Sequence, residues 1–183
     1  MKSIVRFLIV LLTVSFMGCT NETLDQTNLD SRMYKDEICE TGFAYCEKAA
    51  TCFSEDGFQR WGWRLGPFQD GSKEECEIYA GAGKCVIDKG VKVGYYEIGY
   101  DDGKVVVQYH AYEGSLFYEA HLYVGNAMYP TLPNGRPTVA PGQYPYKQSF
   151  PDGTDFVEFR LEDEFEGEIY VIAHSEVCYY EEK

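Results

Sequence analysis

The sequence predicts an all-β domain: a single antiparallel β-sandwich, immunoglobulin-like or jelly-roll-like, that is stabilised by disulfides. Two observations predict this fold. Glycine and proline recur about every 8–12 residues, and the segments between them alternate apolar and polar side chains. Helical periodicity nowhere extends beyond about two turns. Because strands without intervening helices pack sheet on sheet, a sandwich is the leading architecture and a closed barrel is the alternative.

Residues 1–18 have the character of a lipoprotein signal peptide. Two basic residues precede the apolar run of residues 7–17, which is too short to cross a bilayer. The run ends in Gly18-Cys19, which resembles the lipobox of bacterial lipoproteins, although Phe16 and Met17 depart from its usual residues. The resemblance implies that Cys19 is acylated and becomes the first residue, and several acyl chains give stable anchoring. An ordinary signal peptide with an incidental Cys19 is the alternative.

Behind the signal, residues 19–37 are expected to form the lipidated cysteine and a flexible tether, because residues 20–31 are polar and almost without large apolar side chains. Residues 38–183 have the length of one domain and are expected to form the β-sandwich. The net charge of −14 argues against nucleic acid and anionic lipid headgroups as partners. We therefore expect an outer-membrane lipoprotein of the cell envelope, periplasmic or surface-exposed, that contacts the membrane through its lipid.

Six cysteines remain after lipidation of Cys19, and an even number in an oxidising compartment predicts three disulfides. A zinc cluster is the alternative, but the first three cysteines lack the CxxC spacing that structural zinc sites favour. Six cysteines can pair in many ways. One cysteine would open the first strand and another close the last, and chain ends often lie close together. The expected disulfides are Cys39–Cys178, Cys52–Cys85 and Cys46–Cys76.

The expected elements follow in chain order. They are a helical turn at 43–50, a strand at 58–63, a loop with Gly-Pro and Asp-Gly turn signals at 65–72, and a strand at 77–82. The clearest unit is a hairpin of residues 92–100 and 104–112, because Asp101-Asp102-Gly103 between them supplies a glycine for positive φ. Further strands are expected at 116–124, 156–161 and 168–178, and the last is apolar on both faces like a central strand.

Residues 115–147 carry five of the seven prolines, where an apolar strand runs into a long, aromatic-rich connection. A packed strand that leads into an ordered loop is a typical place for a recognition surface in a β protein. The alternative is that the prolines only carry the chain across one end of the sandwich.

Five segments of the chain carry a further resemblance: ATCFSEDGFQRWGW, YAGAGKC, HLYVGN, VAPGQYPY and IYVIAH. They are similar to segments of a recurrent, functionally uncharacterised β domain of secreted Bacteroidota proteins, and the resemblance covers residues 38–178. It implies export and a β domain. It brings no activity and no catalytic residues to this chain.

No motif points to catalysis, and we expect no catalytic residues, no metal and no cofactor. The serines lack a GxSxG elbow, and no cysteine stays free once the disulfides form. The three histidines, His110, His121 and His174, lie on separate predicted strands and would bind a metal together only if those strands were neighbours in register. Separate packing or hydrogen bonding of each is the favoured interpretation. A small secreted hydrolase is the third functional hypothesis.

Aromatic side chains are the candidate binding residues: Tyr144, Tyr146, Tyr129, Trp61 and Trp63. Both tryptophans would share one face of a strand, and core filling is the favoured interpretation for them. For Tyr144 and Tyr146, exposure and burial both stay open. Rigid aromatic rings with polar neighbours build sugar-binding and protein-binding surfaces. We expect a non-catalytic surface binding, adhesion or structural module, and as the alternative a surface glycan-binding protein. The expected partner is a glycan or another envelope protein.

Overall fold

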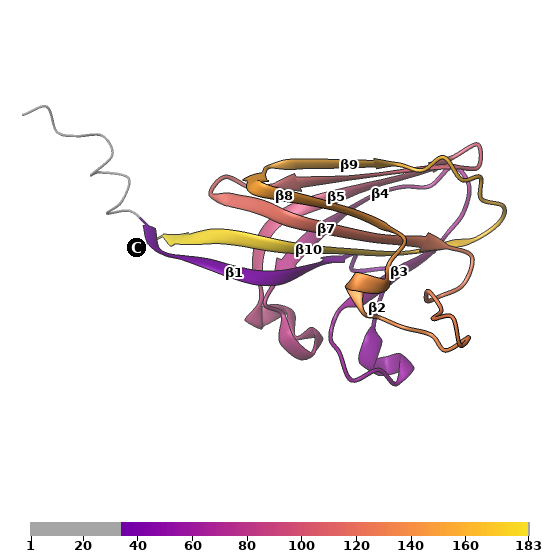
Figure 1. Ribbon diagram of the computed structural model, residues 1–183, viewed down its shortest axis with the longest axis horizontal. Coiled ribbons are helices and arrows are strands. Elements are labelled where there is room, and N and C mark those ends of the chain that lie inside the picture. Colours follow the sequence, from indigo (N-terminus) through magenta and orange to yellow (C-terminus); the bar gives the residue numbers. More distant parts are fainter. Residues whose placement is uncertain (1–33, 183) are drawn as a thin grey trace, which may run out of the picture.

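The computed structural model describes residues 34–182, which form a strand-rich domain (Figure 1). The ten strands in this range are β1 (Tyr34–Tyr45), β2 (Ala50–Cys52), β3 (Trp63–Phe68), β4 (Lys73–Ala80), β5 (Val91–Asp101), β6 (Lys104–Ala111), β7 (Ser115–Gly125), β8 (Tyr146–Thr154), β9 (Phe156–Arg160) and β10 (Ile169–Glu182). Short 3-10 turns lie between some of them: η1 (Phe53–Asp56), η2 (Gly83–Cys85), η3 (Ile87–Lys89) and η4 (Pro141–Gln143). None of the helical turns in this range has the length and apolar character needed to cross a membrane. The predicted signal peptide, Cys19 and most of the tether lie outside the described residues.

Hydrogen bonds join these strands into one antiparallel sheet, in the order β2-β3-β10-β1-β4-β5-β6-β9, with β7 bonded to both β10 and β8. β10 is the centre of this arrangement. Along one side it pairs with β7 from Tyr170 to Tyr179, and along the other it pairs first with β3 and then with β1. This is the segment whose apolar residues on both faces predicted a central strand.

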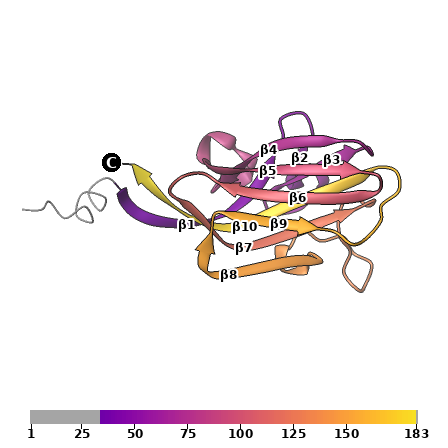
Figure 2. The same ribbon diagram turned by 90° about the horizontal axis from the view of Figure 1, so that it is seen from above.

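The sheet folds over, so that β4, β5 and β6 lie across from β7 and β10 (Figure 2). Two fully buried tyrosines cross the space between these halves. The hydroxyl of Tyr109 on β6 donates to the backbone oxygen of His121 on β7 at 3.1 Å, and the hydroxyl of Tyr96 on β5 lies 3.5 Å from that of Ser175 on β10. The apolar core therefore lies between two sheet layers, as the predicted sandwich-like all-β fold requires.

Three disulfides stabilise the domain, and their pairings are those expected from the sequence. Cys39–Cys178 joins β1 to β10 at directly paired positions, Cys46–Cys76 joins the end of β1 to β4, and Cys52–Cys85 joins β2 to η2. The first pair is separated by 139 residues. A cross-link that closes a long loop restricts the unfolded chain most, so this disulfide is expected to contribute most to stability in a chain-entropy model.

The predicted hairpin is formed by β5 and β6. Asp101 pairs with Lys104, and the two residues between them, Asp102 and Gly103, have φ of 49° and 73°. Two consecutive residues with positive φ give a turn whose twist matches that of the strands it joins. The strands predicted at 116–124, 156–161 and 168–178 correspond to β7, β9 and β10.

The predictions for residues 58–72 are wrong. β3 begins at Trp63, so the expected strand at 58–63 is largely a loop, and β3 extends to Phe68 through most of the expected loop. The Gly66-Pro67 pair marks a bulge, because the pairing with β10 shifts between Leu65 and Phe68, and proline is tolerated at bulges. The helical turn expected at 43–50 is confined to residues 46–50, where the backbone oxygen of Cys46 accepts from the amides of Ala49 and Ala50, because β1 continues to Tyr45.

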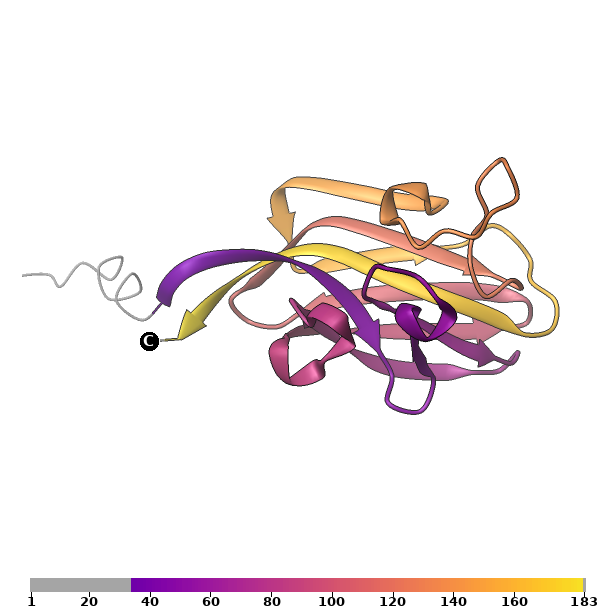
Figure 3. The ribbon, with the colours of Figure 1, turned by 90° about the horizontal axis from the view of Figure 1, so that it is seen from below.

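Two segments cover the outer face of β1, β10 and β7, and together they are called the roof: residues 53–62 and residues 126–145 (Figure 3). They meet through aromatic contacts, with the ring of Tyr129 lying 4.7 Å from that of Phe58 and 6.0 Å from that of Phe53. The long proline-rich connection is therefore packed onto the sheet, and it helps to enclose the site described next.

Candidate functional site

The register of the strands places two rows of side chains on the outer face beneath the roof. Directly paired residues of neighbouring strands project to the same face. One row comprises Phe43, His174, His121 and Lys147. The adjacent row comprises Thr41, Glu176, Glu119 and Ser149. Two histidines therefore lie side by side, each with a glutamate two residues away on the same face.

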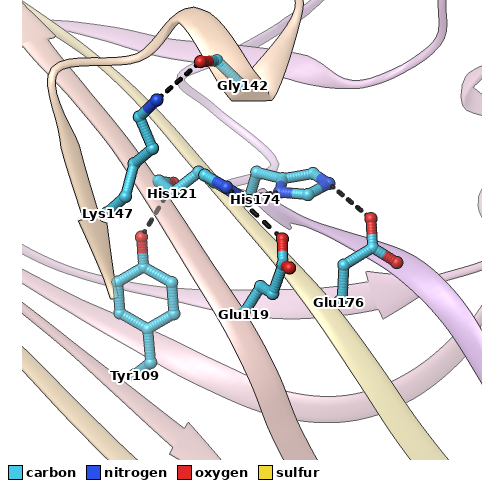
Figure 4. A network of polar contacts seen from close by, with 7 residues as sticks. All are labelled: Tyr109, Glu119, His121, Gly142, Lys147, His174 and Glu176. Atoms are coloured by element: carbon cyan, nitrogen blue, oxygen red, sulfur yellow. Dashed lines mark hydrogen bonds and ion pairs between the residues drawn. The ribbon is translucent and has the colours of Figure 1, made fainter. Parts of the chain in front are cut away.

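The imidazoles of His121 and His174 contact each other directly (Figure 4). Their Nδ1 atoms are 3.0 Å apart, which is a hydrogen bond with one ring donating. On their other sides, Nε2 of His121 lies 3.5 Å from Glu119 and Nε2 of His174 lies 3.6 Å from Glu176. The four side chains form a chain of polar contacts from one carboxylate to the other.

Burial determines the protonation of the two histidines and shifts that of Glu176. His174 is only 2% exposed, and its burial lowers its pKa to about 3, an effect to which the nearby His121 adds. Burial also lowers the pKa of His121, although Glu119 opposes the shift. Burial raises the pKa of Glu176, to which Glu119 and Glu40 add, while a hydrogen bond with Thr41 opposes the shift. Both imidazoles are therefore neutral at pH 7.

The roof is held over these rows by specific hydrogen bonds. The Nζ of Lys147 donates to the backbone oxygen of Gly142 at 2.6 Å, and the buried hydroxyl of Tyr144 donates to the backbone oxygen of Val139 at 3.1 Å. In the other segment of the roof, Asp56 accepts from the hydroxyl of Tyr129 at 2.6 Å. These bonds tie both segments of the roof to each other and to β8.

Gly62 lets the first roof segment pass close over the sheet. Its φ is +134°, and a Cβ at this position would lie 2.5 Å from the ring of Phe53 and 2.8 Å from that of Phe43. Only glycine avoids these clashes. The close approach brings Trp61 against Phe43, with ring centroids 5.2 Å apart in an edge-to-face arrangement.

A pocket of about 390 Å³ opens between the roof and the sheet. Its lining residues are Thr41, Phe43, Gln59, Arg60, Trp61, Val139, Pro141, His174 and Glu176. One part of this lining is aromatic and apolar, and the other offers hydrogen-bond donors and acceptors. A concave site with a few convergent polar groups and a shifted pKa is the usual form of a small-ligand site.

The structure decides which candidate aromatic residues are exposed. The sequence favours core filling for both tryptophans, and it holds for Trp63, whereas Trp61 is half-buried. Tyr144, Tyr129 and Trp63 are buried, so they serve as core residues under and within the roof. Tyr146 is half-buried, and its hydroxyl donates to Asp163. Trp61 is the candidate that lines the pocket. Burial follows from the packing of the proline-rich connection onto the sheet, which the sequence pattern alone does not reveal.

The three histidines do not meet at one point. His110 lies on the other half of the sheet, where it bonds to Glu97, and only His121 and His174 are neighbours. Within residues 34–182, no group of three or more histidine, cysteine or acidic side chains is arranged to hold a metal ion. Ser175 is fully buried beside Tyr96 on the inner face, so it cannot act together with His174.

A second surface is the outer face of β4, β5, β6 and β9, called the open face. Here the register aligns Glu77, Tyr95, His110 and Phe156 in one row. The rings of Tyr95 and His110 stack 4.6 Å apart, and Phe156 at the end of the row is 44% exposed. Two depressions of about 380 and 470 Å³ on this face share Glu75. In one of them, Lys92 bonds to Glu77 and lies over the ring of Tyr79. Paired charges therefore occupy the larger depression, and the smaller one has no aromatic side chain in its lining. The pocket beneath the roof, which combines aromatic and polar groups, is the stronger candidate.

Sequence reasoning missed the polar part of the pocket: Thr41, Gln59, Arg60 and Glu176. The one local signal was in β10, where His174 and Glu176 are polar residues two positions apart, and so on the same face, of a largely apolar strand. Gln59 and Arg60 carried no signal, because they belong to a loop that was expected to be a strand.

No family model matches this chain, and no curated protein and no solved structure matches it. The lipobox and the similarity to the secreted Bacteroidota β domain stay predictions.

Proposed function

We propose that the protein is a non-catalytic binding module of the bacterial cell envelope, an outer-membrane lipoprotein held by lipid on Cys19, and that the pocket beneath the roof is its binding site. The signal-like residues 1–18 and the acidic composition support an exported protein. The three disulfides fit an oxidising compartment outside the cytoplasm.

One observation carries the proposal: a single pocket combines an accessible tryptophan with a buried, neutral histidine. Trp61 forms part of its wall, and His174 forms part of its lining from the sheet. An aromatic ring provides contact area at low entropic cost, and buried polar groups select the partner that satisfies them. Such a combination favours recognition of a specific ligand.

Binding is favoured over hydrolysis by the partners of the two imidazoles. His121 and His174 contact each other and two carboxylates, and no hydroxyl or thiol among the described residues bonds to either ring. A nucleophile activated by a histidine needs that contact. The small secreted hydrolase therefore stays the weaker hypothesis.

Two classes of ligand suit this pocket: a sugar of a glycan, and a side chain of another envelope protein. A thermal-shift screen of the purified lipoprotein against both classes tests the site. At least one ligand should raise the Tm of the wild type and leave that of Trp61→Ala unchanged. A ligand that stabilises both forms equally would place the binding site elsewhere.

The lipid anchor has its own test. Cys19→Ala should move the protein from the membrane fraction to the soluble fraction, because acyl chains on that residue would provide the membrane affinity. If Cys19→Ala and the wild type partition equally into detergent, the lipid anchor is contradicted, and the proposal that the pocket binds a ligand is not affected.

A further inference from the structure

We propose that the pocket beneath the roof binds one neutral sugar unit, such as the terminal residue of a glycan. This inference rests on the proposed function, because it names the ligand of the same site. Four features of the pocket carry it: the fixed orientation of Trp61, the mixture of polar groups, their balance of charge, and the enclosure.

Trp61 is held as a rigid platform. Phe43 contacts it edge-to-face at 5.2 Å, and Trp63 contacts it edge-to-face at 5.9 Å. Edge-to-face pairs of this kind are stabilising beyond the area they bury. A sugar ring has an apolar face of C–H groups, and a pre-oriented indole can accept that face without losing further conformational freedom.

The polar part of the pocket offers donors and acceptors together. Arg60 supplies donors only, Gln59 supplies both, and the carboxylate of Glu176 supplies acceptors. Among the described residues, neither Arg60 nor Gln59 forms a side-chain hydrogen bond or ion pair, although the charge of Arg60 acts on the hydroxyl of Tyr144. Neighbouring hydroxyls of a sugar each donate and accept, so a mixed set of planar polar groups matches them better than a set of one kind.

The charges favour a neutral ligand. Arg60 is the cation of the lining and Glu176 its carboxylate, and Glu119 lies in the same row as Glu176. An anionic ligand would bind Arg60 but face the two carboxylates, and a cationic ligand would face Arg60. His174 does not change this balance, because it is neutral at pH 7.

The roof gives the pocket the size of a small, compact ligand, and the floor of the pocket disfavours an extended peptide. Roof residues such as Trp61 and Pro141 line the pocket together with His174 of the sheet, within about 390 Å³. A peptide that adds to a sheet needs a free strand edge. Here β1 is bonded to β10 and β4, and β10 is bonded to β1 and β7, so the floor of the pocket offers no such edge.

The test uses the full-length lipoprotein in a detergent without sugar headgroups, titrated with neutral hexoses, N-acetylhexosamines, amino sugars and uronic acids. Isothermal titration calorimetry measures the affinity of every variant, because Trp61→Ala removes the fluorophore at the site. In the wild type, where Trp63 is the other tryptophan and is buried, a change in tryptophan fluorescence supports contact of the sugar with Trp61. A neutral sugar should bind at one site per chain. Trp61→Ala should weaken its affinity at least about tenfold, and Trp61→Tyr should recover part of the loss.

Two further variants keep the result interpretable. Glu176→Gln keeps the shape of the pocket and should weaken the same sugar several-fold, whereas Phe156→Ala on the open face should leave its affinity unchanged. A disaccharide ending in the same unit should bind with an affinity similar to that of the monosaccharide. Circular dichroism of each variant confirms that it is folded.

Three outcomes would overturn the inference. Binding of uronic acids or amino sugars in place of neutral sugars would contradict the charge argument. Equal losses in Trp61→Ala and Phe156→Ala would contradict the location. Binding of an envelope protein or peptide that Trp61→Ala abolishes, with no sugar bound at millimolar concentration, would reject the sugar and leave the proposed binding function standing.

Discussion

The roofed face and the open face are two outer surfaces of one sheet, and each carries a histidine beside an aromatic ring. His174 lies 4.9 Å from the ring of Phe43, and His110 lies 4.6 Å from that of Tyr95. The roof leaves His174 only 2% exposed, whereas the side chain of His110 is 27% exposed and bonds to Glu97. The residue types on the two faces are similar, and the faces differ in that the loops of the roof cover only one of them.

Coverage by loops, and not residue type, determines the chemistry of these two rows of side chains. Beneath the roof, burial lowers the pKa of His174 and raises that of Glu176, and a pocket forms between sheet and loops. On the open face, charged side chains pair with one another in contact with water, where ion pairs contribute little to stability. A specific site therefore arises where connecting loops exclude solvent from a polar row.

The largest expected difference between the faces is in stability. Tyr144 is a roof residue that is only 1% exposed, so Tyr144→Ala should lower the free energy of unfolding by about 3–5 kcal/mol. Phe156→Ala on the open face should lower it by less than about 1 kcal/mol. Urea denaturation of both variants measures the difference. Similar losses would show that the roof is not packed as described.

The next effect is the response of stability to pH. Unfolded His174 binds a proton below pH 6.5 and folded His174 only below about 3, so the unfolded state binds more protons between these values and stability falls as the pH falls. We expect the free energy of unfolding to be lower at pH 5.5 than at pH 7.5 by about 1 kcal/mol. Urea denaturation at both pH values measures it.

The groups around His174 set the controls for this experiment. His121 should act in the same direction, since burial lowers its pKa too, with Glu119 opposing and Lys147 adding to that shift. The raised pKa of Glu176 acts oppositely, because its folded state binds a proton more tightly than its unfolded state. His174→Gln should flatten the dependence, and Glu176→Gln should steepen it. A dependence that stays as steep in His174→Gln as in the wild type would contradict the assignment to His174.

The smallest expected effect concerns the bond from Lys147 to the roof. Lys147→Ala removes the donor to Gly142 and should speed hydrogen exchange of the amides of residues 142–144 several-fold, at a cost of about 0.5–1 kcal/mol. The matched variant Lys92→Ala removes an ion pair with Glu77 on the open face and should not change exchange in the roof. Unaltered roof exchange in Lys147→Ala would show that other contacts hold this segment.

Much of the fold could be predicted from local patterns. The Asp-Gly turn located the hairpin of β5 and β6, and the run of apolar residues in β10 identified the central strand. The cysteine positions led to the three disulfides. The errors fell at residues 58–72, where Gly66-Pro67 indicated a turn but forms a bulge that β10 holds in place. Pairing with a distant strand overrode the local signal there.

The candidate site could be predicted only in part. Trp61 and His174 were identifiable as aromatic and polar residues of interest, but their meeting depends on the pairing of β1 with β10 and on the loop that Gly62 lets pass over Phe43. The sequence favoured burial of Trp61 and left the exposure of Tyr144 open, whereas the packing buries Tyr144 and leaves Trp61 half-buried in the lining of the pocket.

The sequence by itself determined the all-β class, the central strand, the hairpin and the disulfide framework, because these depend on alternation, turn chemistry and the positions of cysteines along the chain. Only the tertiary structure decided which polar row is covered and which is left in water. That choice depends on where residues 53–62 and 126–145 come to rest. Their position is set by contacts between residues far apart in the chain, such as Phe53 with Tyr129, which no local pattern encodes.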